Sequence, residues 1–166
     1  MKAIVAVDRK WGIGKNNSLL FNIPLDMDFF RRTTLNKVVV MGSNTLNSFP
    51  NAKPLKNRTN IVLFPRAAKR EDCIIVESLA ELSVLLKQFN TEEVFIIGGA
   101  SVYATMLPFC DTVFVTKVDA DGQAELFYPN LDDMPNWKMT EQSKPVKDGE
   151  YTLTFCTYKN NDTKPF

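Results

Sequence analysis

Short apolar runs recur along the chain and alternate with helical patterns. Most runs lack alternating polar positions, which is typical of strands buried on both faces; they occupy residues 3–7, 38–41, 60–64, 73–76, 94–97 and 112–118. The helical patterns between them lie at residues 24–35, 43–49, 78–89 and 100–107. Strands alternating with helices predict parallel pairing through right-handed crossovers, hence an α/β sheet covered on both faces.

The end of the chain has a different pattern. Residues 136–143 and 150–159 alternate apolar and polar positions and are joined by "KPVKDG", which predicts an antiparallel hairpin. No repeat, low-complexity tract or linker interrupts residues 1–166. We therefore expect one domain, with a mixed, mostly parallel central sheet of about eight strands, a C-terminal antiparallel hairpin and about four flanking helices.

Composition narrows the function classes. The 166 residues are 45% hydrophobic, enough to bury a core, and the net charge is +1 without a long basic cluster; this predicts neither a nucleic-acid nor a membrane partner. The N-terminus matches no signal peptide, and no apolar run reaches membrane-spanning length, so we expect a cytoplasmic protein.

The chemistry available to the chain is restricted. It has no histidine, and its three cysteines lie far apart, which predicts free thiols in a reducing compartment and no metal site. Catalytic triads that need histidine are excluded. Acid–base chemistry must therefore rest on carboxylates, tyrosine, lysine or water.

Two strand-like runs end in glycine and pass directly into a helix start, at Gly42–Thr45 and Gly98–Tyr103. Backbone amides at such corners, with the positive end of the helix dipole, attract phosphate. The pair would suit a pyrophosphate or a dinucleotide. The alternative is that each glycine only makes a turn and that Ser43 or Ser101 caps the helix.

The segment "WGIGKNN" (11–17) lacks the glycine spacing of a nucleotide-binding motif. We interpret it as a flexible loop after the first strand. It serves either as a lid over a ligand or as a plain connection.

Two acids in "FNIPLDMDFFRR" (21–32) face different neighbours. Asp28 precedes two arginines by three and four residues, whereas Asp26 precedes Phe29 and Phe30 by the same spacing. A carboxylate on an apolar stripe is costly unless it is hydrogen-bonded, and a ligand with two adjacent N–H donors would satisfy it. The alternative is that Asp26 serves only the helix dipole.

Two further residues have open alternatives. Arg58, in the polar loop "KNRTN", either binds an anionic ligand tail bidentately or is simply solvated. Thr116 is either an ordinary strand residue or a hydroxyl that points into the cleft.

With these residues, the chain resembles the dihydrofolate reductase family along essentially its whole length. The matching segments occur in the family's order: "AIVAVDRKWGIGKNN", "NIPLDMDFF", "VVVMGSNT", "PLKNRTNIVL", "VFIIGGASVY" and "VFVTKVDAD" followed by "FYP". The resemblance implies a monomeric enzyme that reduces dihydrofolate to tetrahydrofolate by hydride transfer from NADPH.

The resemblance also implies residue roles in the substrate pocket. Asp26 would bind the 2-amino group and N3 of the pterin, with Thr116 as its companion, and Arg58 would bind the glutamate α-carboxylate. The pocket walls and carbonyls would come from Ile4, Phe30, Phe49, Leu55 and Ile97. Water admitted by the loop would protonate pterin N5.

For the cofactor, the resemblance implies a cradle at the two glycine corners, a cis peptide between Gly98 and Gly99, and a mobile loop over residues 12–19. The implied cofactor-binding residues are Ala6, Ile13, Gly14, Leu19, Gly42, Ser43, Asn44, Thr45, Leu63, Phe64, Arg66, Gly98, Gly99, Ala100, Ser101, Val102 and Tyr103.

The chain departs from the family pattern at several positions. Phe21 replaces a tryptophan and cannot fix the ordered water usually held there, so proton delivery is expected to differ. Ser43 and Ser101 replace cations that bind the cofactor phosphates. NADH is thus a possible cofactor beside NADPH, and Arg66 is the remaining candidate for the 2′-phosphate. Glu125 replaces an aspartate that latches the mobile loop.

Two other interpretations of the sequence stay open. One is a related pterin or pyrimidine reductase of the same fold, such as the reductase of riboflavin synthesis. The other is a protein that binds a folate or a nucleotide without turnover.

Overall fold

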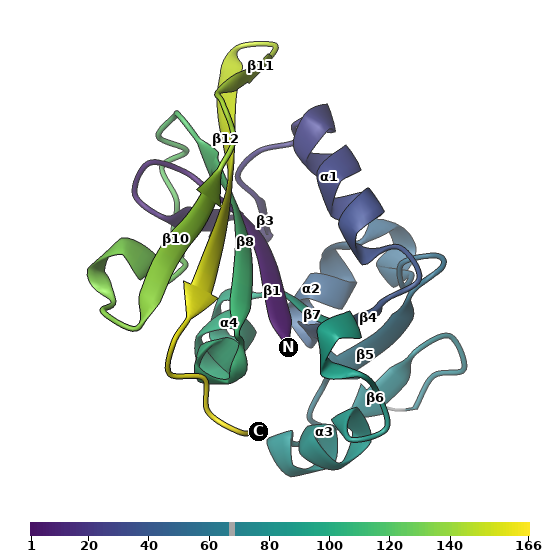
Figure 1. Ribbon diagram of the computed structural model, residues 1–166. Coiled ribbons are helices and arrows are strands. Elements are labelled where there is room, and N and C mark those ends of the chain that lie inside the picture. The colour runs from purple at the N-terminus through teal and green to yellow at the C-terminus, as the bar shows by residue number, and fades with distance from the viewer. Residues whose placement is uncertain (67–68) are drawn as a thin grey trace.

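The computed structural model describes residues 1–66 and 69–166. Its main sheet is built from β1 (Lys2–Val7), β4 (Val38–Gly42), β5 (Thr59–Leu63), β6 (Ile74–Val76), β7 (Val94–Gly98), β8 (Thr112–Val118), β10 (Trp137–Gln142), β11 (Val146–Asp148) and β12 (Tyr151–Asn160). The strand order is β10-β12-β8-β1-β7-β4-β5-β6, and β11 pairs with β12 (Figure 1). The six strands from β8 to β6 in this order pair in parallel, and β12 joins them antiparallel. This confirms the predicted mixed α/β sheet.

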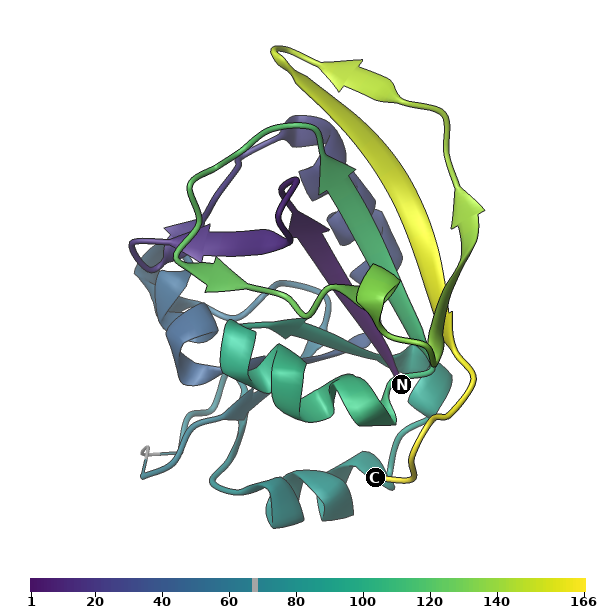
Figure 2. The ribbon, with the colours of Figure 1, turned by 90° about the vertical axis from the view of Figure 1, so that its left-hand side faces the viewer.

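Among the described residues, four helices cover the sheet, all within the predicted spans: α1 (Pro24–Thr34), α2 (Ser43–Ser48), α3 (Leu79–Leu86) and α4 (Ala100–Met106). Short 3-10 turns occupy Pro50–Ala52, Thr91–Glu93, Leu107–Phe109 and Leu131–Asp133. Figure 2 shows α4 in front of the strands and α3 below it, with α1 and α2 behind.

The period of two along each strand divides the core between these faces. Val38 and Val40 belong to the cluster that includes side chains of α3 and α4, whereas Val39 and Met41 belong to the cluster that includes Leu46 of α2. Both faces of β4 are therefore buried, which explains why its sequence shows no polar alternation.

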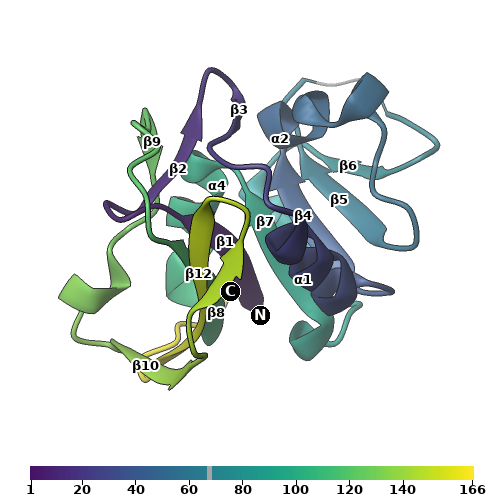
Figure 3. The same cartoon turned by 90° about the horizontal axis from the view of Figure 1, so that it is seen from above.

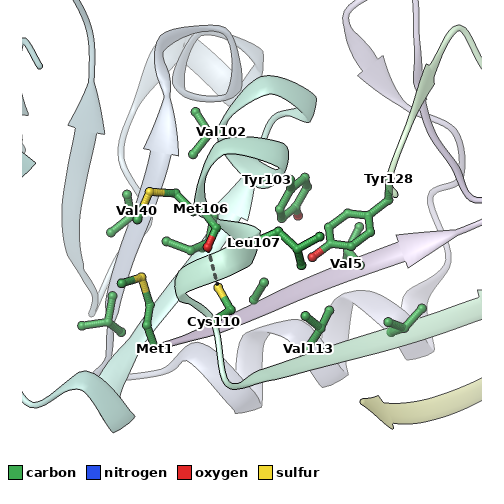
Figure 4. Close-up of a cluster of buried hydrophobic side chains, with 14 of the residues drawn as sticks. Met1, Val5, Val40, Val102, Tyr103, Met106, Leu107, Cys110, Val113 and Tyr128 are labelled. Carbon is green, nitrogen blue, oxygen red and sulfur yellow. Dashed lines mark hydrogen bonds between the residues drawn. The ribbon is translucent and has the colours of Figure 1, made fainter. Parts of the chain in front are cut away.

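Figure 4 shows the packing of α4 on the sheet. The Cys110 thiol is buried there and donates a hydrogen bond to the Met106 carbonyl oxygen at 3.4 Å. Burial raises the pKa of Cys110 to about 12. All three cysteines are free, as the sequence predicts, and Cys110 serves as a core residue.

The prediction of an irregular loop after the first strand is wrong. Residues in it form β2 (Gly12–Lys15) and β3 (Ser18–Leu19), which with β9 (Leu126–Phe127) make a separate three-stranded sheet (Figure 3). Asn16 and Asn17 both have positive φ, as a tight hairpin turn requires. The partner strand β9 is more than a hundred residues away along the chain, so local pattern could not reveal the pairing.

The C-terminal antiparallel hairpin is confirmed with one addition. The segment predicted as its connection contains β11, which pairs with β12 in the register Asp148↔Tyr151. Strand β12 is ten residues long and also pairs with β8 and β10. In the described part of the chain, no helix is long and apolar enough to cross a membrane.

Candidate active site

Asp26 lies in the first turn of α1, which begins at Pro24, a residue whose fixed φ suits the first helical position. The carboxylate is half-buried and faces the hydroxyl of Thr116 on β8, which is 1% exposed. Burial raises the pKa of Asp26, and the Thr116 hydroxyl opposes this in part. No cation among the described residues contributes to the shift, so Asp26 is a carboxylate without a charged partner in this part of the protein.

Asp28 has the solvated surroundings expected from its spacing. Its oxygens accept hydrogen bonds from Arg31 at 2.7 Å and from Arg32 at 2.9 Å. These bonds hold the pKa of Asp28 below its usual value. The two acids of α1 are thus separated by the helix into an inner and an outer position.

The residues expected to wall the substrate pocket belong to one apolar cluster. Ile4 and Ile97 are buried in it, and three half-buried side chains pack against it: Phe30, Phe49 and Leu55. The Tyr103 hydroxyl donates a buried hydrogen bond to the Ile4 carbonyl oxygen at 2.7 Å. Burial and the nearby Asp26 carboxylate both raise the pKa of Tyr103, so α1, β1 and α4 converge on this place.

Arg58 is held rather than loosely solvated. Its guanidinium donates to Thr34 Oγ1 at 3.2 Å, to the Lys56 carbonyl oxygen at 2.7 Å and to the Arg31 carbonyl oxygen at 3.1 Å. All three acceptors are neutral, and burial together with the charge of Arg31 lowers the pKa of Arg58. Because only neutral groups hold the Arg58 guanidinium, its positive charge stays available to bind an anion.

The two glycine corners lie side by side because β4 and β7 pair in parallel. A Cβ on Gly98, whose φ is +134°, would lie 3.2 Å from Thr45 Oγ1, and a Cβ on Gly42 would lie 3.1 Å from Val102 Cγ2. Each corner is therefore closed by the helix that follows the other. The Gly98–Gly99 peptide bond is cis, as predicted.

The alternative assignment of the two serines as helix caps is wrong. Helices α2 and α4 begin after Gly42 and Gly99, which occupy the capping positions, and neither cap uses a side chain. Backbone amides at both helix starts thus lack side-chain acceptors. These free backbone donors at two adjacent helix starts fit a pyrophosphate.

The expected cofactor residues extend beyond the corners. A cavity of about 90 Å³ lies beside α4 between Leu63, Leu79, Ser101, Val102 and Thr105. Arg66 is exposed just after β5 and has a φ of +64°. Arg70, four residues after Arg66, donates hydrogen bonds to the carboxylate of Asp72 at 2.7 Å and to the Ala52 carbonyl oxygen at 2.9 Å.

The small sheet holds the residues expected in the mobile loop. Gly14 pairs with Leu19 and contacts the strand that carries Leu126. Ile13 packs against the main core, whereas Leu19 is 77% exposed. Glu125 Oε1 accepts a hydrogen bond from the Asn16 amide at 2.8 Å, so glutamate at this position makes a loop-to-loop contact.

Comparison with known proteins identifies the family. The family model described as dihydrofolate reductase matches residues 1–160. The chain belongs to the dihydrofolate reductase family.

Individual relatives agree with this membership. The chain is 32% identical to a dihydrofolate reductase of Bacillus subtilis (strain 168), over 97% of this chain and 95% of that protein. It is 34% identical to one of Staphylococcus haemolyticus, over 94% of this chain and 93% of the relative. A solved structure of dihydrofolate reductase from Enterococcus faecalis, complexed with NADP(H) and RAB-propyl, is 28% identical, with a TM-score of 0.85 over 97% of this chain and 96% of that chain.

The remaining expected site residues frame the pocket from β1 and from the segment before α1. Ala6 is half-buried on β1 opposite Thr116. The Phe21 ring packs edge-on against Tyr151, with ring centroids 5.1 Å apart, and joins the cluster of Ile23, Val118 and Leu153. Phe21 offers no hydrogen-bond donor at its position.

Sequence reasoning missed Asp8, which ties two loops together. It is 3% exposed, and its carboxylate accepts hydrogen bonds from the amides of Lys10, Gly12 and Gly122 at 2.8, 2.7 and 3.1 Å. A Cβ on Gly12 would lie 2.9 Å from either carboxylate oxygen. The available signal was an acid directly after a buried strand, with glycine four residues later.

Proposed function

We propose that the protein reduces dihydrofolate to tetrahydrofolate with a nicotinamide cofactor of the NADPH type, and so supplies folate one-carbon metabolism. The observation that carries this proposal is Asp26, a half-buried carboxylate beside Thr116 with an apolar wall and no charged partner among the described residues. Membership of the dihydrofolate reductase family supports it, as does the likeness to a reductase complexed with NADP(H).

Asp26 is the residue we assign to the pterin. Two adjacent N–H groups of the pterin, at the 2-amino group and N3, would occupy both oxygens of the carboxylate. Thr116 faces the same carboxylate and would fix its orientation, directly or through water. Pterin binding would thereby supply the hydrogen bonds that this buried acid otherwise lacks.

The apolar walls hold the reacting rings in a dry cleft. When bound, the reduced nicotinamide supplies a hydride to pterin C6. Ile4, Ile97, Phe30 and Phe49 would restrict the pterin and the adjoining aromatic ring, and such positioning is worth about 7–11 kcal/mol in favourable cases. The main task of these residues is orientation and exclusion of bulk water.

Protonation of pterin N5 would use water, since sequence and structure offer no other acid beside the carboxylate of Asp26 in the described pocket. Asp26 would favour the protonated form electrostatically. Phe21 packs on Tyr151 and has no N–H group, so we propose that the entering water is less ordered here than in family members that have tryptophan.

Arg58 is assigned to the glutamate tail of the substrate. Its guanidinium is oriented by three neutral acceptors and retains its charge. A related pterin or pyrimidine reductase, whose substrate has no such tail, has no need of a cation fixed in this way. Leu55, in the same apolar cluster as Phe49, would contact the aromatic ring between pterin and tail.

The cofactor phosphates are assigned to the glycine corners, with amides from Gly42, Asn44 and Thr45 on one side and from Gly99 to Val102 on the other. The adenosine end would lie at the cavity beside Leu63 and Ser101. Arg66 is exposed and is our candidate for the 2′-phosphate, so we propose a preference for NADPH over NADH. Ile13, Gly14 and Leu19 would close over the nicotinamide.

We further propose that residues 1–166 act as a single-domain monomer in the cytoplasm. The three free cysteines support a reducing compartment such as the cytoplasm. The short, scattered basic groups support the absence of a nucleic-acid partner.

The test is a spectrophotometric assay of dihydrofolate-dependent oxidation of NADPH and, separately, of NADH. We expect turnover with both, and a lower KM for NADPH. Ligand binding without turnover would show that the protein is a binding protein and not an enzyme. Equal KM values for the two cofactors would overturn the role of Arg66 but not the reductase assignment.

A further inference from the structure

The start of α1 is held by the hairpin of β11 and β12. The Leu25 amide donates a hydrogen bond to Asp148 Oδ2 at 3.0 Å, across 123 residues of sequence. The helix has no side-chain cap of its own, because Ile23 occupies the capping position and Pro24 has no N–H group. A carboxylate from the hairpin therefore satisfies one of the free amides of the first turn and complements the helix dipole.

The same hairpin contacts the chain on both sides of Leu25. The Tyr151 ring packs edge-on against Phe21 at 5.1 Å, and the Phe155 ring packs against Phe29 at 5.0 Å. Phe29 lies one turn after Leu25 on α1, and Phe21 lies in the non-helical segment before the helix, so the hairpin contacts the chain on both sides of the first turn. Figure 1 shows the hairpin and the start of α1 at the same end of the molecule.

We propose that Asp148 is a positioning residue for Asp26 and acts through the first turn of α1. This inference rests on the proposed function, in which Asp26 binds the pterin. Asp26 directly follows Leu25, and its carboxylate must face Thr116. Without the acceptor from Asp148 the Leu25 amide has only water as a partner, the first turn frays more often, and Asp26 is held less firmly in its orientation toward the pterin.

The kinetic test compares Asp148→Ala with Asp148→Asn, because the amide oxygen of asparagine still accepts a hydrogen bond. We expect kcat/KM for dihydrofolate to fall about fivefold in the alanine variant and to stay within about twofold of wild type in the asparagine variant. The KM for NADPH should not change in either. Glu150→Ala, which removes a carboxylate from the same turn, is the matched control and should behave as wild type.

The second measurement does not depend on catalysis. Amide hydrogen exchange of Leu25, followed by NMR without substrate, should be about fivefold faster in Asp148→Ala and near wild type in Asp148→Asn. Unchanged exchange in the alanine variant would overturn the inference. So would an asparagine variant as impaired as the alanine variant, or a loss of rate with both KM values unchanged, which indicates fewer folded molecules.

The two proposals can fail separately. If wild type does not turn over dihydrofolate, the proposed function fails whatever Leu25 does. If wild type is active and Asp148→Ala has the kinetics of wild type, Asp148 has no positioning role.

Discussion

Asp26 and Asp28 lie two residues apart on α1, but the helix turns one toward the sheet and the other toward solvent. The pKa of Asp26 is raised, mainly by burial, whereas that of Asp28 is lowered by hydrogen bonds from Arg31 and Arg32. Burial thus raises the pKa of one aspartate on this helix, whereas hydrogen bonds and ion pairs lower that of the other. No arginine among the described residues contributes to the pKa of the inner carboxylate, which leaves it free to accept hydrogen bonds from a ligand.

The strongest test of this difference is Asp26→Asn. Asparagine replaces one of the two acceptor oxygens by an NH2 donor and carries no charge, so we expect kcat at neutral pH to fall at least about 100-fold. Activity should recover partly at low pH, where solution protonates the pterin. Steady-state rates across the pH range measure this, and a variant as fast as wild type would remove Asp26 from the mechanism.

Arg58→Ala tests whether Arg58 binds the anionic tail of the substrate. Loss of a charged, bidentate contact to the substrate tail should raise the KM for dihydrofolate about 10- to 100-fold and leave the KM for NADPH unchanged. Arg58→Lys should recover only part of the loss, since lysine lacks the planar fork. An unchanged KM in the alanine variant would favour a reductase whose substrate has no glutamate tail.

As pH rises, the stability of Asp26→Asn relative to wild type should increase, whereas its relative activity should decrease. Because burial raises the pKa of Asp26 above the ordinary value of 3.8, the folded state holds its proton more tightly than the unfolded state does. The free energy of unfolding of wild type therefore loses a contribution as pH rises from the ordinary carboxyl pKa through the raised one. Asparagine does not titrate, so the Asp26→Asn variant does not lose this contribution to the free energy of unfolding.

Urea denaturation of the ligand-free proteins between about pH 4 and pH 7 measures the effect. The stability of Asp26→Asn relative to wild type should increase with pH over this window. A difference that is constant or shrinks with pH would contradict a buried Asp26.

Asp28→Ala should have the smallest effect. A lowered pKa gives stability above the ordinary carboxyl pKa that is lost as pH falls through the folded value, but ion pairs as exposed as this one contribute little. We expect the thermal midpoint at neutral pH to change by no more than about 2 °C and the kinetics to match wild type. A large loss of activity would show that the outer face also shapes the pocket.

Much of this architecture could be predicted from local pattern. The apolar runs marked the parallel strands, and the spacing of the two acids against Phe29 and Arg31 assigned their faces. The glycines after β4 and β7 marked the two corners. In each case the signal lies within a few residues, where helix and strand periods fix which side chains share a face.

Other features could be recognised only in the folded structure. The pairing of β2 with β9 joins segments more than a hundred residues apart, and the acceptors that hold Arg58 include the carbonyl oxygen of Arg31, 27 residues earlier. The link from Asn16 to Glu125 spans 109 residues, and that from Leu25 to Asp148 spans 123. No local period encodes such pairs.

The sequence by itself therefore determined the helices and the buried strands of the main sheet, the inward direction of Asp26 and the place of the glycine corners. Tertiary structure alone decided which loop pairs with which, which groups hold Arg58, and which side chain caps the helix that carries Asp26. The physical reason is that backbone periodicity acts between near neighbours, whereas hydrogen bonds between loops and hairpins depend on where the whole sheet brings their ends together.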